Sequence, residues 1–274
     1  MIAGKIFFRL KRQIDWDFSG KKFTRVVQPE AVLPYVLFQH ATPLNRNLPA
    51  VEQWLQQNKV KNLAIAIPKI NGLILRPKEV FSLWLLVGKP TKAKGYAEGF
   101  ILENGKARPG IGGGLCQLSN LIYWMTLHTP LTVLERWRHS YDVFPDCNRT
   151  IPFGSGATCS FPSLDLQIYN SSAQTFQLLI AFKDGYLTGE WRSSAPAEYS
   201  YQIYEAYHEI TSDLWGCYLR HNRLRRKVFD AKMTQIGDEL ITENHARMMY
   251  EPLLTANLKP SFEKEKGDEP DETV

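Results

Sequence analysis

The chain has 274 residues, of which 44% are hydrophobic and 22% are charged, and its formal net charge is +5. This composition is that of an ordinary soluble globular protein with one large or two small domains, and so mild a charge argues against nucleic-acid binding. Four cysteines without a Cys-x-x-Cys pair exclude a disulfide scaffold, a zinc ribbon and a thioredoxin-type motif. No stretch approaches the roughly 18 apolar residues of a transmembrane helix.

The N-terminal segment, residues 1–16, contains only a short apolar run from Ile6 to Phe8. A secretory signal needs an apolar core of about 7–15 residues, so we expect a cytoplasmic protein. The segment fits a small helix that either packs at the domain edge or lies on an anionic membrane surface. In the second case the protein would be held weakly at the inner face of the membrane. The basic residues available for that contact are Lys5, Arg9, Lys11 and Arg12.

The first half of the chain predicts helices with short strands between them. Residues 49–59 place Val51, Trp54 and Leu55 on one helical stripe, and Asn71-Gly72 is a turn signal. Pro77 is typical of the first turn of another helix. The expected short strands are 62–67, 74–75 and 95–104.

From about residue 131 the pattern changes to strands that alternate or are rich in aromatic and β-branched residues. The expected strands are 133–143, 164–169, 174–182, 186–192, 199–210, 215–221 and 234–242. Helices followed by strands indicate an α+β fold. We expect a helix-rich N-terminal half, with a Cys-bearing helix packed on a mostly antiparallel sheet, followed by a β-rich C-terminal part.

Four regions follow from this organisation. Residues 1–30 are an N-terminal extension, 31–170 a core domain and 171–258 a β-rich C-terminal extension. Residues 259–274 contain six acidic residues, three lysines and two prolines, which predicts a disordered tail.

The strongest chemical signal is Gly112-Gly113-Gly114-Leu115-Cys116-Gln117. Apolar residues recur at spacings of three and four behind it, which predicts that a helix begins near Cys116. A helix start offers free N–H groups and partial positive charge, both of which favour a thiolate. The three glycines allow a backbone to pass close to a substrate, and we include them among the substrate-binding residues.

His139 is the predicted base for this thiol. One helix and one turn separate it from Cys116, which is enough to bring the strand 133–143 back to the helix start. His128 is less suitable because it lies at the far end of the helix. Asp165 is our choice for the third group, which orients the imidazole, and Asp142 and Asp146 are the alternatives.

The backbone N–H of Cys116 and the side-chain amide of Gln117 are predicted oxyanion donors. Ser140, next to His139, completes the predicted substrate-binding set. We expect no cofactor and no metal.

Several structural readings compete with these assignments. Cys116 is also consistent with a buried structural cysteine, and His139 with a core histidine. The glycine run lacks the Lys-Ser/Thr of a P-loop, and the spacing of Cys116, His139, Cys147 and Cys159 matches no zinc pattern. We expect Cys147, Cys159 and Cys217 to be non-catalytic, and the basic run 220–227 to be a solvated hairpin end.

Four segments together resemble the VanW family over roughly residues 30–170. Residues 76–84 are similar to its Pro-Gly-Glu-x-Phe-Ser motif, with Lys78 in place of glycine, and 95–99 to its Gly-Tyr segment. Residues 112–117 are similar to its central motif, and 135–140 to its Glu-Arg-His-x-His-Ser motif. The C-terminal strands resemble those of the stand-alone, vancomycin-resistance-associated branch.

The resemblance implies a bacterial protein linked to glycopeptide resistance and peptidoglycan. Some VanW-domain proteins are linked to L,D-transpeptidation, with the motif cysteine as nucleophile. This carries the family's catalytic candidates onto Cys116 and His139. We therefore expect a cysteine-dependent acyl transferase or amide hydrolase whose partner is a peptidoglycan peptide or precursor. The competing class is a non-catalytic accessory protein that binds a cell-wall precursor or a resistance partner.

Overall fold

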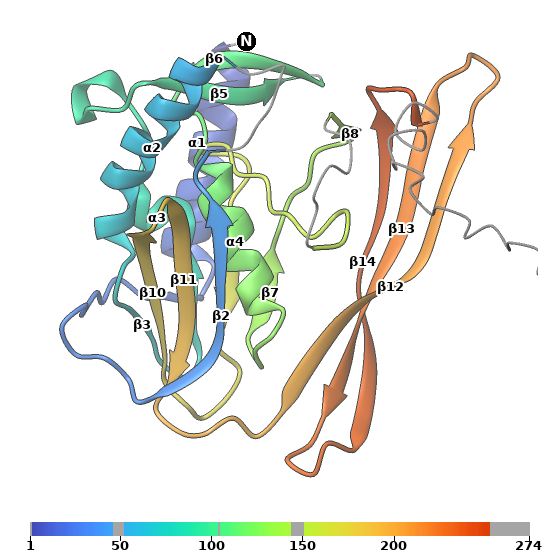
Figure 1. Ribbon diagram of the computed structural model, residues 1–274. Helices are drawn as coiled ribbons and strands as arrows, with labels where there is room; N and C mark the ends of the chain where they lie inside the picture. The colour runs from blue at the N-terminus through green and yellow to red at the C-terminus, as the bar shows by residue number, and fades with distance from the viewer. Residues whose placement is uncertain (1, 46–51, 104, 144–150, 253–274) are drawn as a thin grey trace, which may run out of the picture.

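The computed structural model describes residues 2–45, 52–103, 105–143 and 151–252, and it has an α+β fold with 22% helix and 42% strand (Figure 1). The predicted class is confirmed, although "helix-rich" overstates the N-terminal half. The helices of the described residues are α1 (Ile2–Phe18), α2 (Gln53–Ala66), α3 (Leu83–Val87) and α4 (Cys116–Thr126). Within the described residues, none of them is both long and apolar enough to cross a membrane.

Helix α4, which begins at Cys116, packs on a four-stranded antiparallel sheet (Figure 1). The order is β2 (Tyr35–Pro43), β11 (Tyr186–Ser193), β10 (Phe176–Lys183) and β3 (Leu73–Leu75). The buried indole of Trp191 donates to Thr126 Oγ1 at 3.0 Å, and a Cβ at Gly189 would lie 2.7 Å from Met125 Cε. Helix and sheet are thus in close contact, and the predicted packing of the Cys-bearing helix is confirmed.

A second sheet has the order β1 (Lys22–Phe23), β4 (Glu79–Ser82), β9 (Gln167–Tyr169) and β7 (Thr132–Glu135), and β7 leads into the segment that contains His139. The predicted continuous strand 133–143 is wrong. It ends at Glu135, makes one isolated bridge from Trp137 to Thr158, and resumes as β8 (Tyr141–Asp142). The reason is that β9 is too short to pair further, and that Arg136 turns inward, where its Nε donates to the carbonyl of Gly156 at 2.8 Å.

Two other local predictions were wrong. Residues 62–67, expected as a strand, form the end of α2 and a following 3-10 turn, Ile67–Lys69, because Asn62, Leu63 and Ala66 all face the core at helical spacing. The helix expected at Pro77 is instead the strand β4, since Lys78 has a φ of 63°, which no α-helix accommodates. Helix α3 starts six residues later, where Ser82 Oγ caps the N–H of Leu85.

The start of the helix predicted at 49–59 lies partly outside the described residues, which show α2 from Gln53. The Asn71-Gly72 turn is confirmed, and the glycine has a φ of 86°. The strand predicted at 95–104 is present as β5 (Glu98–Glu103), which forms a hairpin with β6 (Lys106–Ile111).

The C-terminal part forms a long sheet that projects beside the core (Figure 1). Its order is β12 (Ser200–Ser212), β13 (Tyr218–Phe229), β14 (Gln235–Met248) and the short β8. An ion pair between Arg220 on β13 and Asp142 on β8 (3.2 Å) lies within the sheet. A hydrogen bond from Asn222 Nδ2 to Phe153 O (2.7 Å) attaches the sheet to the core.

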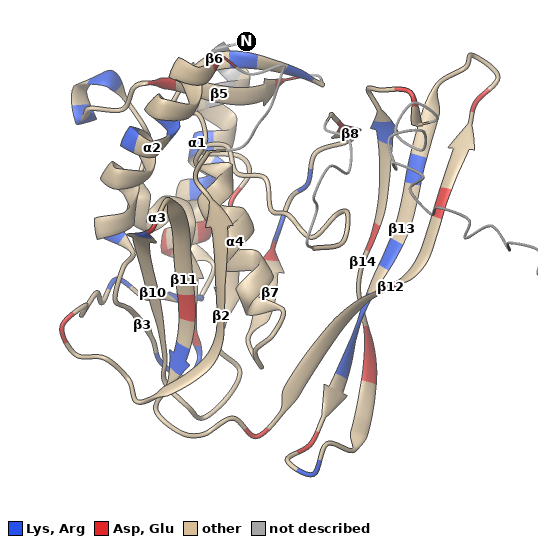
Figure 2. Ribbon diagram, in the orientation of Figure 1, with Lys and Arg blue, Asp and Glu red and all other residues tan. Residues whose placement is uncertain are grey.

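The basic run 220–227 was predicted to be a solvated hairpin end. It instead forms the body of β13. Its arginines face acidic residues on β14, as in Arg223–Glu243 at 2.7 Å and Arg226–Glu239 at 2.5 Å (Figure 2). Cross-strand pairing explains why so many basic residues fit into one central strand. The tail predicted at 259–274 lies outside the described residues.

Candidate functional site

The glycine run that precedes Cys116 is required by close packing. A Cβ at Gly113 would overlap the carbonyl carbon of Gly99, and one at Gly114 would overlap the side chain of Lys59. Gly112 and Gly114 also have φ values of 74° and 93°, which favour glycine. These glycines therefore face the protein's own β5–β6 hairpin and α2, and their binding of a substrate stays a prediction.

Cys116 occupies the first residue of α4, as predicted, and is half-buried. No described residue accepts a hydrogen bond from its backbone N–H, since the first paired amides are those of Gln117 and Leu118. The positive end of the helix dipole and a free amide are therefore both present at the sulfur atom.

Three groups surround the sulfur of Cys116. The Sγ of Cys159 lies 3.8 Å away, and the Cys159 carbonyl oxygen lies 3.5 Å away. The imidazole of His139 lies close enough to the same sulfur to lower the pKa of Cys116. The structure thus brings together the two residues predicted as nucleophile and base, and it adds Cys159, which the sequence analysis had set aside as non-catalytic.

The two thiols have opposite acidities. The hydrogen bond from the Cys159 thiol holds the pKa of Cys116 well below its ordinary value, and the hydrogen bond with His139 acts in the same direction against the effect of burial. The same thiol contact, together with burial, raises the pKa of Cys159 well above its ordinary value. The contact between the two thiols therefore favours ionisation of Cys116 over ionisation of Cys159.

The segment that contains Cys159 is fixed against α4 by side chains of that helix. Ser119 Oγ donates to the carbonyl of Ala157 at 2.6 Å, and Asn120 Oδ1 accepts from the Ala157 N–H at 2.6 Å. Arg136, in the motif that also holds His139, donates to the carbonyl of Gly156. These contacts keep Cys159 beside the start of α4 across 43 positions of sequence.

Asp165 is fully buried, but its recorded partners lie on the side of α1 and α3. Its carboxylate accepts hydrogen bonds from Ser82 Oγ at 2.5 Å and the Trp84 N–H at 3.0 Å, and it lies 3.8 Å from Arg12 NH1. Burial raises the pKa of Asp165 to about 6. Its charge also raises the pKa of Cys159, so its influence on the site reaches the second thiol, and its role as orienting group for the imidazole stays a prediction.

The other predicted site residues have these environments. Gln117 uses both side-chain N–H groups on β2, donating at 2.9 Å to Thr42 Oγ1 and at 2.9 Å to Pro43 O. Ser140 is exposed, and its carbonyl accepts from the Arg247 N–H at 3.0 Å. Asp142 binds Arg220 and the Tyr250 hydroxyl, while Asp146 and Cys147 lie outside the described residues.

His128 is a structural residue. Its ring stacks on Phe38 at 3.8 Å between centroids, and burial lowers its pKa to about 4. Within the described ranges, no group of three or more His, Cys, Asp or Glu residues is arranged to hold a metal ion.

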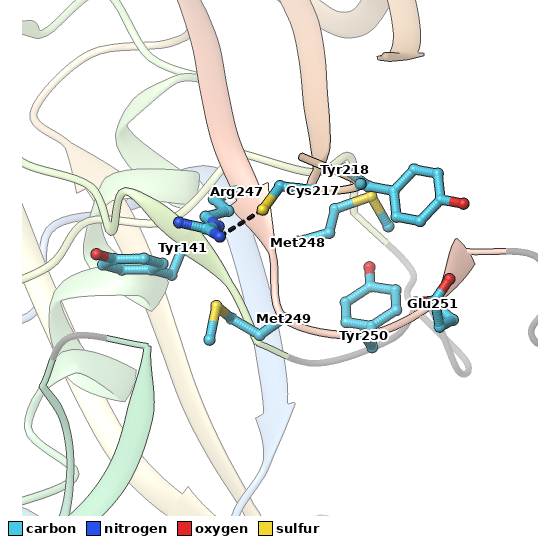
Figure 3. A pocket seen from close by; sticks show the side chains of 9 residues that line it. Tyr141, Cys217, Tyr218, Arg247, Met248, Met249, Tyr250 and Glu251 are labelled. Atoms are coloured by element: carbon cyan, nitrogen blue, oxygen red, sulfur yellow. Dashed lines mark hydrogen bonds between the residues drawn. The ribbon is translucent and has the colours of Figure 1, made fainter. Parts of the chain in front are cut away.

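A cavity of about 520 Å³ lies between β8, the start of β13 and the end of β14, and neither Cys116 nor Cys159 lines it (Figure 3). Cys217 lines it, and the Arg247 guanidinium points at that sulfur. Neither Cys116 nor His139 contributes to its lining. The residues around it are Tyr141, Tyr218, Met248, Met249, Tyr250 and Glu251.

Two residues that hold the segments around the site in place, Glu135 and Arg136, were not predicted. Glu135 and Arg136 stood in the motif that led to His139, and their positions could have marked them as supports. Glu135 binds Arg12 of α1 with both oxygens, at 2.6 and 2.7 Å, and also accepts from the Asp165 N–H. Cys159 was considered as one of four residues whose spacing matches no zinc pattern, and no feature of the sequence placed it beside Cys116.

Comparison with known proteins agrees with the resemblance. The family model for VanW like protein matches residues 58–192. The vancomycin B-type resistance protein VanW of Enterococcus faecalis (strain ATCC 700802 / V583) is 34% identical over 233 residues, which cover 85% of this chain and 84% of that protein. The uncharacterized protein YoaR of Bacillus subtilis (strain 168) is 28% identical over 118 residues, which cover 43% of this chain and 37% of that protein. No solved structure matches the chain significantly. The extent of the match to the Enterococcus faecalis protein shows that the chain belongs to the VanW family, which is linked to vancomycin resistance.

Proposed function

We propose that the protein is a Cys116-dependent acyl transferase or amide hydrolase that acts on the peptide of peptidoglycan or of a peptidoglycan precursor. The observation that carries the proposal is the position of Cys116, at the first residue of α4 and close enough to His139 for the imidazole to lower the pKa of the thiol. A thiolate at a helix start with an adjacent imidazole is the arrangement that nucleophilic thiol catalysis requires.

The chain's own groups are sufficient for an acyl-transfer sequence. His139 takes the thiol proton, and the Cys116 sulfur attacks the carbonyl carbon of a peptide bond. The backbone N–H of Cys116 is free to bind the oxyanion, whereas the Gln117 amide is occupied by β2. His139 then gives its proton to the leaving amine as the C–N bond breaks. Attack of an amine or water on the thioester carbonyl, with its proton passing to His139, breaks the C–S bond and releases the Cys116 thiolate.

The substrate class rests on family membership. A relative of 34% identity is named for vancomycin B-type resistance. Vancomycin is a glycopeptide antibiotic, and glycopeptides bind the peptides of cell-wall precursors. We therefore assign the peptide stem as the substrate, and we propose the cytoplasmic precursor as its form.

A non-catalytic accessory role is the second candidate. It is favoured by the cavity of about 520 Å³ in Figure 3, which is large enough for a small ligand and is not lined by the catalytic candidates. In that case the protein would bind a wall precursor or a resistance partner beside β8 and β14.

Intact-mass analysis after incubation with tetrapeptide stem fragments distinguishes the two. An acyl-enzyme predicts a covalent adduct that is lost in Cys116→Ser and retained in Cys217→Ser, the matched control at the cavity of Figure 3. Reversible binding without an adduct, abolished by Arg247→Ala rather than by Cys116→Ser, would support the accessory role and overturn the enzyme.

A further inference from the structure

We propose that Cys116 and Cys159 form a reversible intramolecular disulfide when a peroxide-class oxidant reaches the site. Their sulfurs lie 3.8 Å apart, and about 1.8 Å of approach separates them from the roughly 2.05 Å of a disulfide. Formation of this disulfide does not depend on the acyl-transfer proposal. Only the expected loss of activity on disulfide formation rests on that proposed function.

The two cysteines are placed for different steps of the oxidation. Cys116 is the less buried residue of the two, and we assign its sulfur as the one that reacts with a small oxidant. Cys159 is only 9% exposed and sits behind it, held by the contacts of Ser119 and Asn120 to Ala157. A low-pKa, accessible thiol beside a resolving thiol is the arrangement found in redox-sensitive cysteine pairs.

The chemistry balances without a metal or a cofactor. The Cys116 thiolate attacks one oxygen of hydrogen peroxide, so that an S–O bond forms, the O–O bond breaks and hydroxide leaves. The Cys159 thiol gives its proton to that hydroxide, and its sulfur attacks the sulfenic sulfur of Cys116. The S–S bond forms, the S–O bond breaks and hydroxide departs, taking a proton from solvent. Peroxide is reduced, and the two thiols are oxidised.

The disulfide would remove the proposed nucleophile and protect it. A sulfenic acid without a resolving thiol proceeds to the sulfinic acid, which is not readily reversed, whereas a disulfide is restored by a dithiol. Cys159 would thus allow Cys116 to survive oxidation in an inactive form.

Intact-mass analysis of the full-length protein after treatment with hydrogen peroxide tests the pairing. We expect a loss of two hydrogen atoms, loss of iodoacetamide labelling at Cys116, and recovery of both with dithiothreitol. In Cys159→Ser we expect addition of one and then two oxygen atoms at Cys116. Cys217→Ser and Cys147→Ser are the matched controls and should behave as the wild-type protein does.

Two results would overturn the proposal: oxygen addition at Cys116 in the wild-type protein without disulfide formation, and a disulfide of Cys116 with a cysteine other than Cys159. Acyl-adduct formation with stem peptides is measured separately, under reducing conditions. A failure of the acyl-enzyme therefore leaves the disulfide result intact, and the reverse is equally true.

A second inference concerns α1. Its apolar side chains Ile6, Leu10, Ile14 and Phe18 follow at intervals of four, which places them on one face of the helix, and they are 54–79% exposed. The opposite face is attached to the core, through Arg12 to Glu135 and through Trp16 Nε1 to Ser82 Oγ at 3.1 Å. The apolar face of the helix is therefore directed away from the protein.

We infer that this face of α1 docks on an anionic lipid surface. Charge complementarity favours this occupant, because no acidic residue precedes Asp15, while Arg9 and Lys11 are exposed beside the apolar residues. Apolar side chains in the acyl boundary with basic residues at the headgroups are the arrangement of an interfacial helix.

Co-sedimentation of the full-length protein with vesicles tests the inference. We expect binding to an equal mixture of phosphatidylglycerol and phosphatidylcholine, weaker binding at high salt, and little binding to phosphatidylcholine alone. The double substitution Leu10→Ser with Ile14→Ser should lower the partition coefficient at least about tenfold.

Trp215→Ser is the matched control, because this side chain is 89% exposed at the β12–β13 turn, well separated from α1 (Figure 1). Equal binding to both kinds of vesicle, or loss of binding in Trp215→Ser alone, would overturn the assignment to α1. Lipid-independent dimerisation that the double substitution abolishes would do so as well, by identifying a second copy as the occupant.

Discussion

The core around α4 and the sheet β12–β14 differ in how deeply their charged and aromatic side chains are buried. In the core, Arg12 is 7% exposed and joins the half-buried carboxylate of Glu135 and the buried carboxylate of Asp165. In the sheet, Arg223 and Glu243 form their ion pair with about half of each side chain in water. Exposed pairs contribute little, whereas breaking a buried pair leaves an uncompensated charge in a poorly solvated site. Ion pairs in this protein therefore contribute to stability mainly where they are buried, as between α1 and the core and between Arg220 and Asp142.

Tryptophan shows the same contrast. Trp191 is fully buried between α4 and the sheet and donates to Thr126, whereas Trp215 is exposed at a turn. Trp191→Ala should lower the free energy of unfolding by about 3–5 kcal/mol, because it leaves a cavity in the core. Trp215→Ala should change it by less than about 0.5 kcal/mol. Urea denaturation measures both, and equal effects would mean that the two regions are not energetically distinct.

The ion pairs extend the comparison to charge. Arg12→Met keeps most of the side-chain stem but leaves the buried carboxylate of Asp165 and the half-buried carboxylate of Glu135 without their partner, and should cost about 3 kcal/mol. Arg223→Met, the matched exposed substitution, should cost less than about 1 kcal/mol and even less at high salt. Thermal denaturation at two salt concentrations provides the measurement. A stable Arg12→Met protein would show that α1 is not needed to neutralise the core.

Asp165 should give the core a pH dependence of its own. Burial raises its pKa to about 6, above the roughly 3.9 of an unfolded aspartate. Its stabilising contribution is therefore fully present below about pH 4 and is lost as the pH rises through 6, by on the order of 3 kcal/mol. Comparing denaturation of the wild-type protein and Asp165→Asn from pH 4 to 7 isolates it. A wild-type protein that gains stability over Asp165→Asn across this range would show that the ion pair with Arg12 dominates.

The smallest expected effect concerns reactivity at the boundary between the two regions. His139→Gln should raise the pH midpoint of Cys116 alkylation toward that of an ordinary thiol, because it removes a hydrogen bond that favours the thiolate. His128→Gln, at the other end of α4, should leave the midpoint unchanged. Iodoacetamide rates measured against pH provide the test. Equal midpoints in His139→Gln and wild type would assign the low pKa to Cys159 and the helix start alone.

The strands after residue 160 were predictable because their alternation survives in the sequence. β10 and β11 appear within one or two residues of their expected bounds, while β13 was cut short at residue 221 because arginines obscured the buried positions of Leu224 and Val228. Residues 62–67 misled because a short apolar run fits a strand and a helix end equally well.

The candidate site was predictable only as far as local pattern reaches. Cys116 at the start of α4 follows from the glycine run and the apolar spacing, and the resemblance joined it to His139. The contact with Cys159 depends on hydrogen bonds of Ser119, Asn120 and Arg136 with a segment without regular structure. These hydrogen bonds cannot be predicted from the spacing of apolar residues. The attachment of Asp165 to Arg12 likewise spans from α1 to β9.

Gly99 and Gly113 each occupy the space that a side chain on the other would need. A side chain at either position would therefore clash with the backbone of the other. Side chains at both positions would force the β5–β6 hairpin away from the start of α4. A descendant that had lost all chemistry at residue 116 would still have to keep both glycines in order to fold. In searches through related genomes, the glycine motif is thus a marker of ancestry, and only the residues around the sulfur can tell an active copy from an inactive one.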